Sequence, residues 1–553
     1  MADDAPSTTS VPDSSINYQR IRVPRVDEST LQIPPLSEFD SLWDSNLSGN
    51  ATQRSVAIRK FANVETLGEW QDEARREIRQ LAANYSSQYL PNGSTEEILS
   101  RSDQVIASGH QPNLFHPGVW FKNACLSHLA SRTHAFAVNL IVDSDLCTNR
   151  SCLIPKIETN GQLRFGWVTF DQHSSSEPFE CAHVIDEPRF QSFPQRLAEP
   201  LRQFGSTNKP IVFKLWEHLQ TVRQQMPEAP LGHWLAAARH RLEWAHGWRS
   251  LELPLSQLAA SRCFATFALA IFQHIDAFQT TFNDLLADYR QVHRIRSKAH
   301  PVPSLTQYQN GSHLWLEAPF WIWSEQSSER KPLFVCVTAN SIQLTDRQGI
   351  LIALKQHEFQ NEFCKLGEQG IFIRPRALMT TMVSRMLLSD LFIHGIGGAK
   401  YDQLTDAIAA RFFGIQLPDF LTLSATRTLP VDRGAVEPGK LSDLKFQQRQ
   451  IKYHPERLLH HNANATQLIQ DKQRLVQQIK REGTSKLIHD AMVTINQRLQ
   501  SMVSPSVEEL QQQEQVVRSK LRDNEVIGCR EFSFCLFDES LIDWLTKTAL
   551  GAT

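Results

Sequence analysis

The stretch SGHQPNLFHPG, residues 108–118, constrains the fold of this chain more than any other part of it. The short apolar run Val105–Ala107 precedes it and is long enough for a buried strand. After it, Phe121, Cys125 and Leu129 recur at the spacing of one helix face. A strand that ends in a glycine loop and leads into a helix aims backbone N–H groups at one point. The sequence therefore predicts a small-molecule site at the edge of an α/β sheet.

This predicted loop carries more polar side chains than a plain connection requires. The helix dipole makes the loop attractive to an anion. We expect His110 and His116 to be catalytic. The residues expected to bind substrate or an anion here are Gly109, Gln111, Asn113 and Lys122. The alternative is a structural turn in which both histidines hydrogen-bond to the backbone.

A second strand is predicted over Phe136–Val142, which is nearly all apolar, as in a strand covered on both faces. It ends in Asp143-Ser144-Asp145. Because open α/β sheets present their ligands just beyond such strands, we expect Asp143 and Asp145 to be catalytic. The alternative is that either aspartate only caps the next turn.

The segment Ile373–Thr426 predicts a second unit of the same kind. Pro375 stands at a plausible first helical position, the strand Phe392–His394 follows, and a glycine loop leads into a helix that Gly414 ends. The residues expected to bind substrate or an anion in this unit are Arg374, His394, Gly395, Gly397, Gly398, Lys400 and Asp402. With the first unit, this one predicts a Rossmann-like, doubly wound α/β core.

The glycine loop does not match a dinucleotide fingerprint. The G-x-G-x-x-G pattern needs a third glycine where Lys400 stands, and Phe420–Ser424 lacks the acidic residue that would follow. The chain has no P-loop, H-E-x-x-H or G-x-S-x-G sequence. We therefore leave the cofactor open, with ATP or another nucleotide as one option. The nine cysteines form no C-x-x-C pair, so no metal site is expected.

Length and charge set the broad class of the protein. A chain of 553 residues with 41% hydrophobic and 21% charged residues suggests several structural units. A net charge of −2 gives no reason to expect nucleic-acid or membrane partners. Residues 1–17 read as a disordered tail without the apolar region of a signal peptide. We expect a cytoplasmic protein with a core over residues 18–436, including a helical and irregular insertion around 161–347.

The composition changes after Lys440. Ile488, Ala491, Ile495, Leu499 and Met502 are spaced as in a coiled-coil seam, and Ser504-Pro505-Ser506 then breaks the chain. This predicts an antiparallel helical coiled-coil arm over residues 440–525, with a hairpin between residues 467 and 521. Because a protruding hairpin gains by pairing with a second copy, we expect a homodimer. Residues 526–553 are expected to pack back on the core.

Three stretches resemble the bacillithiol biosynthesis cysteine-adding enzyme family. Residues 109–122 are similar to its T-G-Q-Q-x-G-L…G-P…K segment, residues 392–401 to its Y-V-G-G-P-G-E-I-A-Y segment, and the helical hairpin to its coiled coil. The family's E-D-H-D signature is here at best Asp143–Leu146, and His110 replaces a glutamine, as in a divergent relative. The resemblance implies a Rossmann-like core, dimerisation through the arm, and addition of cysteine to glucosaminyl malate.

These observations leave two hypotheses. The first is an amide-forming ligase that adds cysteine, or a similar small molecule, to an amino-sugar malate-type acceptor. Such a reaction needs an activated carboxylate and a base that keeps the amine unprotonated. The alternative is a non-catalytic small-molecule-binding or scaffold protein that keeps the fold and the coiled coil.

Overall fold

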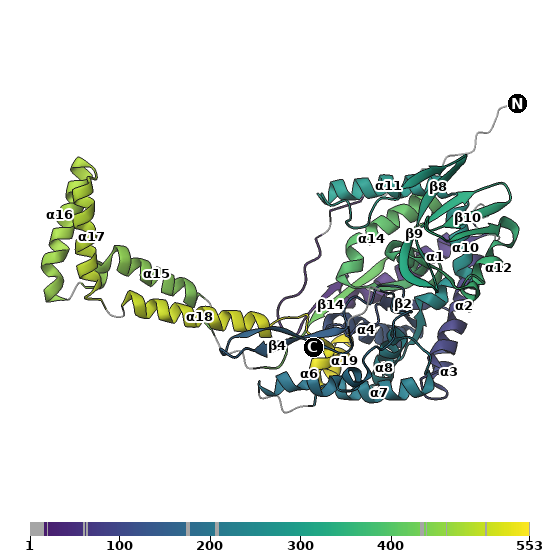
Figure 1. The fold of residues 1–553 in the computed structure, drawn as a ribbon, viewed down its shortest axis with the longest axis horizontal. Coiled ribbons are helices and arrows are strands. Elements are labelled where there is room, and N and C mark those ends of the chain that lie inside the picture. The colour runs from purple at the N-terminus through teal and green to yellow at the C-terminus, as the bar shows by residue number, and fades with distance from the viewer. Residues whose placement is uncertain are drawn as a thin grey trace.

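The computed structural model describes residues 16–551, apart from 19, 59–60, 62–64, 173–176, 205–208, 432–435, 438, 460–461 and 504–505. The tail predicted at the N-terminus and the predicted break at Ser504-Pro505 lie outside these residues, except for the last two tail positions, Ile16 and Asn17. Figure 1 shows a body of helices and sheets from which a helical arm extends. None of the helices within the described ranges combines the length and apolar character needed to span a bilayer.

The body is a mixed α/β structure built on a six-stranded sheet. The strand order is β1-β14-β13-β2-β3-β6, and every neighbouring pair is parallel except β1 with β14. The bounds are β1 Ser29–Ile33, β2 Val105–His110, β3 Phe136–Ile141, β6 Leu251–Pro254, β13 Leu391–His394 and β14 Phe420–Thr426. The strands predicted at 105–107, 136–142 and 392–394 are therefore confirmed.

Both faces of this sheet are covered because the side chains of its strands alternate between two hydrophobic cores. Val105 and Ala107 of β2 pack into one core, and Ile106 packs into the other. The first core takes in α2 (Leu67–Ser86), α10 (Arg262–Phe272), α11 (Ile275–Val292) and α14 (Ile396–Ile408). The second takes in α4 (Pro117–Thr133) and the C-terminal α19 (Ser540–Ala549), which pack together. A strand covered on both faces has little room for polar residues, which explains the apolar runs in the sequence.

A second, antiparallel sheet begins within the insertion predicted around 161–347 to be helical and irregular, and it continues beyond it to Pro375. Its order is β11-β10-β9-β8-β12, with β7 paired to β8. The bounds are β7 Gln307–Asn310, β8 His313–Ser324, β9 Ser327–Val337, β10 Ser341–Thr345, β11 Leu351–Lys355 and β12 Ile371–Pro375. Smaller elements complete this region: the hairpin β4 (Ser151–Ile157) with β5 (Leu163–Thr169), and helices α5 to α9 between residues 187 and 259.

Pro375 does not begin a helix, contrary to the prediction. It is the last residue of β12, paired with Phe320 of β8, and α13 begins at Ala377. α13 ends at Val383, and a π-helical turn, Ser384–Leu388, leads to β13. The local signal was ambiguous, because proline is as well tolerated at the last position of an edge strand as at the first position of a helix.

The arm contains four helices and not one hairpin. They are α15 Lys440–Tyr453, α16 Thr466–Glu482, α17 Lys486–Gln500 and α18 Val507–Ile527. α16 packs along α17, and α15 packs along α18 (Figure 1). The predicted pairing within residues 467–521 is wrong because Gly483, with φ of +81°, ends α16 and reverses the chain there. The predicted seam residue Leu499 is nevertheless buried, where it meets Leu444 and Leu510.

Candidate functional site

A cavity of about 680 Å³ opens at the carboxyl ends of β2, β3, β13 and β14. Its walls come from the loops after these strands, from the first turns of α4 and α14, and from the second sheet. Parallel α/β sheets present their ligands at this edge, and the volume suits one small molecule.

The cavity brings together the segments that the sequence predicts to carry the site. The predicted residues that line it are Gly109, His110, Gln111, His116, Lys122, Asp145, His394, Gly395, Gly397 and Gly398. The predicted residues that do not line it are Asn113, Asp143, Arg374, Lys400 and Asp402. The two strand–loop–helix units therefore meet at the cavity as predicted, although five of the predicted side chains do not line it.

Lys122 is a buried cation on the cavity wall. Only 4% of it is exposed, and its Nζ donates to the carbonyl oxygen of Gly109 at 2.7 Å. Burial, together with the charge of Arg239, lowers the pKa of Lys122 to about 7. The lysine therefore changes charge near neutral pH, and an anion in the cavity would favour its protonated form.

The first turn of α14 faces the same space. Gly395 is its N-cap and supplies no side-chain cap, so the N–H groups that follow are left for another acceptor. A Cβ added at Gly395 would lie 3.9 Å from Cδ and Cε of Lys122. A phosphate or carboxylate placed here would meet both the helix N-terminus and the ammonium group.

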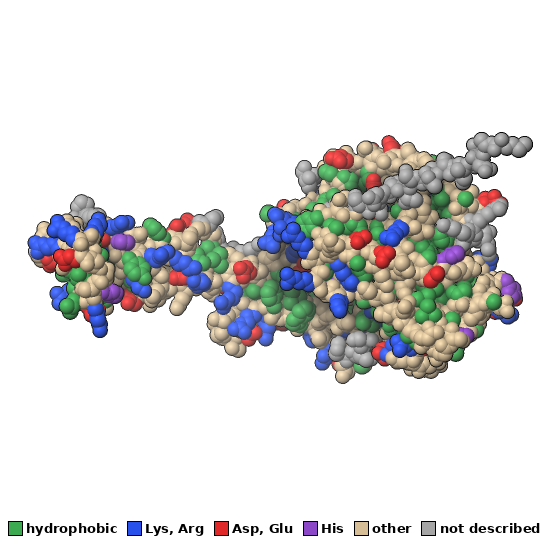
Figure 2. Space-filling model, turned by 90° about the horizontal axis from the view of Figure 1, so that it is seen from above, with side chains coloured by type: hydrophobic (Ala, Val, Ile, Leu, Met, Phe, Trp, Pro, Cys, Tyr) green, Lys and Arg blue, Asp and Glu red, His purple; other side chains and the backbone are tan. Residues whose placement is uncertain are grey.

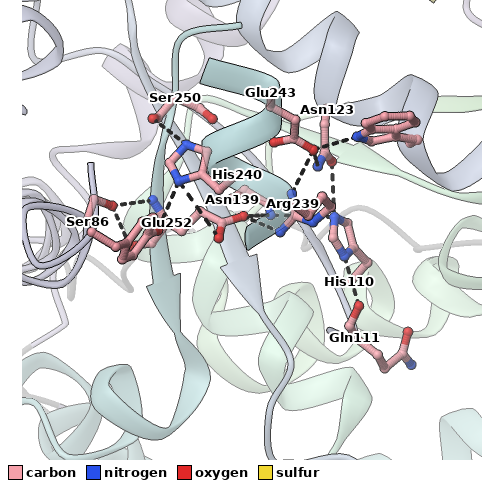
Figure 3. Close-up of polar contacts among 12 residues, drawn as sticks. Ser86, His110, Gln111, Asn123, Asn139, Arg239, His240, Glu243, Ser250 and Glu252 are labelled. Carbon is pink, nitrogen blue, oxygen red and sulfur yellow. Dashed lines mark hydrogen bonds and ion pairs between the residues drawn. The ribbon is translucent and has the colours of Figure 1, made fainter. Parts of the chain in front are cut away.

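His110 belongs to a buried polar network, shown in Figure 3. Its Nδ1 donates to the carbonyl of Gln111 at 3.0 Å, and its Nε2 lies 3.1 Å from Oδ1 of Asn123 and 3.5 Å from Nδ2 of Asn139. Burial, with the charges of Arg239 and Lys122, lowers the pKa of His110 well below its usual value. Both ring nitrogens are engaged, so the structural alternative fits His110 better than the catalytic one.

Behind His110 the network is centred on Arg239. Its guanidinium bridges Glu243, at 2.8 Å, and Glu252 (Figure 3). Glu243 also accepts from Trp120 at 2.6 Å and from Asn123 at 2.9 Å. All these side chains are buried, so the network fixes α4, α8 (Leu231–Ala245) and β6 relative to one another.

His116 is the N-cap of α4. Its Nδ1 accepts from the backbone N–H of Gly118 at 3.0 Å, which leaves the proton on Nε2, 3.8 Å from a carboxylate oxygen of Glu531. Burial, then the charges of Arg530 and Lys122, lowers the pKa of His116 to about 3. The capping bond explains this histidine without a catalytic role.

The two predicted aspartates have different surroundings. Asp143 is fully buried and accepts from the ring of His233 at 2.8 Å and from the backbone N–H and hydroxyl of Ser256 at 2.9 and 2.5 Å. It fixes the end of β3 and does not face the cavity. Asp145 does face it, held by Gln111 at 3.0 Å and by Arg330 at 3.3 Å.

Three predicted anion-binding residues lie away from the cavity. Arg374 forms a buried ion pair with Glu180 at 2.7 Å, because it lies in β12 and not at a helix start. Asn113 and Lys400 are exposed. Lys400 occupies the second turn of α14, outside the N-terminal turn that faces the cavity.

His394 and Asp402 form a buried pair beside α14. The ring donates from Nε2 to Oδ2 of Asp402 at 2.8 Å. Burial raises the pKa of Asp402, but Arg385, at 2.6 Å, and His394 outweigh it and hold the pKa at about 2. Asp402 therefore stays ionised behind His394, which itself lines the cavity.

The remaining polar wall comes from residues that the sequence did not indicate. Arg330 and Arg376 both pack on the ring of Trp321, at 5.1 and 4.2 Å from its centroid, and all three line the cavity. Arg530, from the C-terminal segment, donates to the hydroxyl of Ser424 at 3.0 Å. Arg330 and Arg530 occur in segments without a loop motif, so only the tertiary structure brings them to the site.

The described part of the chain contains no group of three or more His, Cys, Asp or Glu side chains placed to hold a metal ion. No known protein family matches the sequence, and no curated protein matches it either. Fold and site together define a mixed α/β protein with a cation-lined cavity at the edge of its parallel sheet.

Proposed function

We propose that this protein is an amide-forming ligase acting on small molecules, a divergent relative of the enzymes that add cysteine to an amino-sugar malate. The observation that carries the proposal is the set of charged groups that line the cavity at the end of the parallel sheet. Lys122 and the first turn of α14 offer an anion site on one wall, Arg330 and Arg376 offer cations on another, and Asp145 supplies a carboxylate. A carboxylate-bearing acceptor and an amino acid require this mixture of charges.

The charges of these residues indicate which substrate group each of them would bind. The anion site at Lys122 suits a carboxylate or phosphate, because helix N–H groups and an ammonium point at it. Asp145 suits the ammonium group of an amino acid, since its side chain is 41% exposed at the cavity. A core of the Rossmann-like, doubly wound type is part of the same proposal.

The experiment is product formation by the purified full chain. The protein is incubated with cysteine, glucosaminyl malate and either ATP or no nucleotide, and the condensed product is sought by mass spectrometry. We expect the product with wild type and with the control His357→Gln, whose side chain is 75% exposed on the surface. Lys122→Met is expected to lose at least tenfold in rate. Absence of product under every condition refutes the proposed reaction.

One observation favours the non-catalytic alternative. Asp143, part of the segment that resembles the family's acidic signature, has both carboxylate oxygens occupied by His233 and Ser256. In a scaffold protein Asp143 would only need to hold the end of β3 in place and would take part in no reaction. Ligand binding without turnover, seen as a thermal shift with the same compounds, would support this alternative.

We also propose that the arm forms a homodimer contact in a cytoplasmic protein. Hydrophobic side chains are interspersed with Lys and Arg on the arm (Figure 2), among them Phe446, Leu487 and Val516. Leu487 is 82% exposed, and pairing with a second copy would bury it. All nine cysteines are free thiols, which fits a reducing compartment.

A further inference from the structure

Three histidines line the cavity, and their ring nitrogens differ in availability. In His110, Nδ1 lies 3.0 Å from the carbonyl oxygen of Gln111, and Nε2 lies 3.1 Å from Oδ1 of Asn123 and 3.5 Å from Nδ2 of Asn139. In His116 one nitrogen accepts the helix-capping bond and the other is protonated toward Glu531. His394 differs from both, because its Nδ1 has no hydrogen-bond partner among the described residues and is not the protonated nitrogen, whereas the unbonded Nε2 of His116 carries the proton.

The surroundings of His394 fix which nitrogen is free. Ionised Asp402 can only accept, so Nε2 carries the proton and Nδ1 carries the lone pair. Asp402 is itself held by Arg385, whose guanidinium also binds Asp406 at 2.7 Å. The imidazole packs against the rings of Phe392 and Phe420, whose centroids lie 4.7 and 4.8 Å away.

Gly398 keeps the space beside the free nitrogen open. A Cβ at this position would come 2.6 Å from Nδ1, closer than any normal contact. Gly398 has no positive φ, so its backbone conformation does not require glycine. The absence of a side chain is therefore explained by access to the ring.

We propose that His394 is the general base of this cavity and that Asp402 is the positioning residue that holds its tautomer. The inference rests on the proposed amide synthesis. The step is one proton transfer: the ammonium group of the amine substrate loses a proton, which bonds to Nδ1 of His394. Asp402 stabilises the imidazolium that results, and the neutral amine is then able to attack an activated carboxyl carbon.

The charged groups that face His394 are Asp402 on α14, Arg385 on the π-helical turn and Lys122 on α4. Burial lowers the pKa of His394, Asp402 opposes this, and Arg385 and Lys122 add to the lowering. The ring is therefore neutral at pH 7 and able to accept a proton. Lys122 is the competing base, but its Nζ is directed to the carbonyl of Gly109 beside the anion site.

The test compares His394→Asn and Asp402→Asn with wild type and with the control His357→Gln, all as full chains. Amide synthesis is followed against pH, and hydrogen exchange at the imidazole C2 position, read by mass spectrometry, gives the pKa of each histidine. His394→Asn should lose at least about 100-fold in kcat with KM changed less than about threefold. In Asp402→Asn the pKa of His394 should fall, and the acidic limb of kcat/KM should move to lower pH with it.

Two results would overturn the inference: a His394→Asn variant with more than half of the wild-type kcat, or a pKa of His394 that is the same in Asp402→Asn. If wild type forms no amide, the proposed function fails, and the exchange measurement alone decides whether Asp402 controls His394. A fall of that pKa then supports the pair, and no change refutes it.

Discussion

Removing the charge of Arg239 tests whether the buried network behind the cavity holds the body together. Arg239 is 2% exposed, and its partners Glu243 and Glu252 are 2% and 0% exposed. Arg239→Met leaves two buried carboxylates without their cation. Breaking one such buried pair costs about 3–5 kcal/mol, so we expect a loss of at least that size in the free energy of unfolding of the body.

The assay is urea denaturation followed by tryptophan fluorescence, with the transition of the body analysed by itself. The matched control is Arg411→Met, which removes an exposed ion pair to Asp284 and should cost about 1 kcal/mol or less. The triple variant Arg239→Met/Glu243→Gln/Glu252→Gln removes all three charges and should recover part of the loss. A loss below about 1 kcal/mol for Arg239→Met, equal to that of the control, would refute the reasoning.

Three further predictions follow from the cavity and the arm. Gly398→Ala should destabilise the protein by about 1–3 kcal/mol, because the new Cβ meets His394, whereas Gly397→Ala, with nothing within 4 Å, should not; thermal unfolding of both decides. The pKa of Lys122 is about 7 when folded and near 10.5 when unfolded, so burying its charge costs stability below pH 7 and this cost disappears as pH rises from 7 to 10.5. The stability of Lys122→Met relative to wild type should therefore be highest below pH 7, and urea midpoints measured across this range test this. Phosphate binding to wild type, measured by calorimetry, should weaken above pH 7. Light scattering should give twice 63.1 kDa for the full chain and a single copy when a short linker replaces residues 440–527; a full chain at 63.1 kDa at micromolar concentration refutes the dimer.

Much of the core could be predicted because its strands are covered on both faces. The runs at Val105–Ala107 and Phe136–Val142 are apolar for that reason, and the glycine loop after Phe392–His394 marks the second unit. The cavity between the two units followed from the general rule on where open sheets bind ligands. The second sheet was not predicted, since its pairings join β8 to residues 371–375, far along the chain.

The roles of individual side chains were less predictable, because each depends on a partner from elsewhere in the sequence. Asp143 and Asp145 are two residues apart, yet His233 and Ser256 occupy the first while the second faces the cavity. His116 was predicted to be catalytic, because the sequence does not show that α4 begins directly after it and that its side chain caps this helix through Gly118. Which helices pair in the arm depends on one glycine, Gly483, which ends α16 within an otherwise continuous helical pattern.

The end of α18 gives the arm a direct mechanical connection to the cavity. α18 ends at Ile527, and Arg530, only three residues later, already lines the cavity. Arg530 approaches so closely that a Cβ on Gly118 would lie 2.6 Å from its guanidinium. A helix of 21 residues thus acts as a rigid lever whose inner end is attached beside the binding site. Along the chain, only Gly528 and Cys529 therefore separate the end of the arm from a residue of the cavity wall.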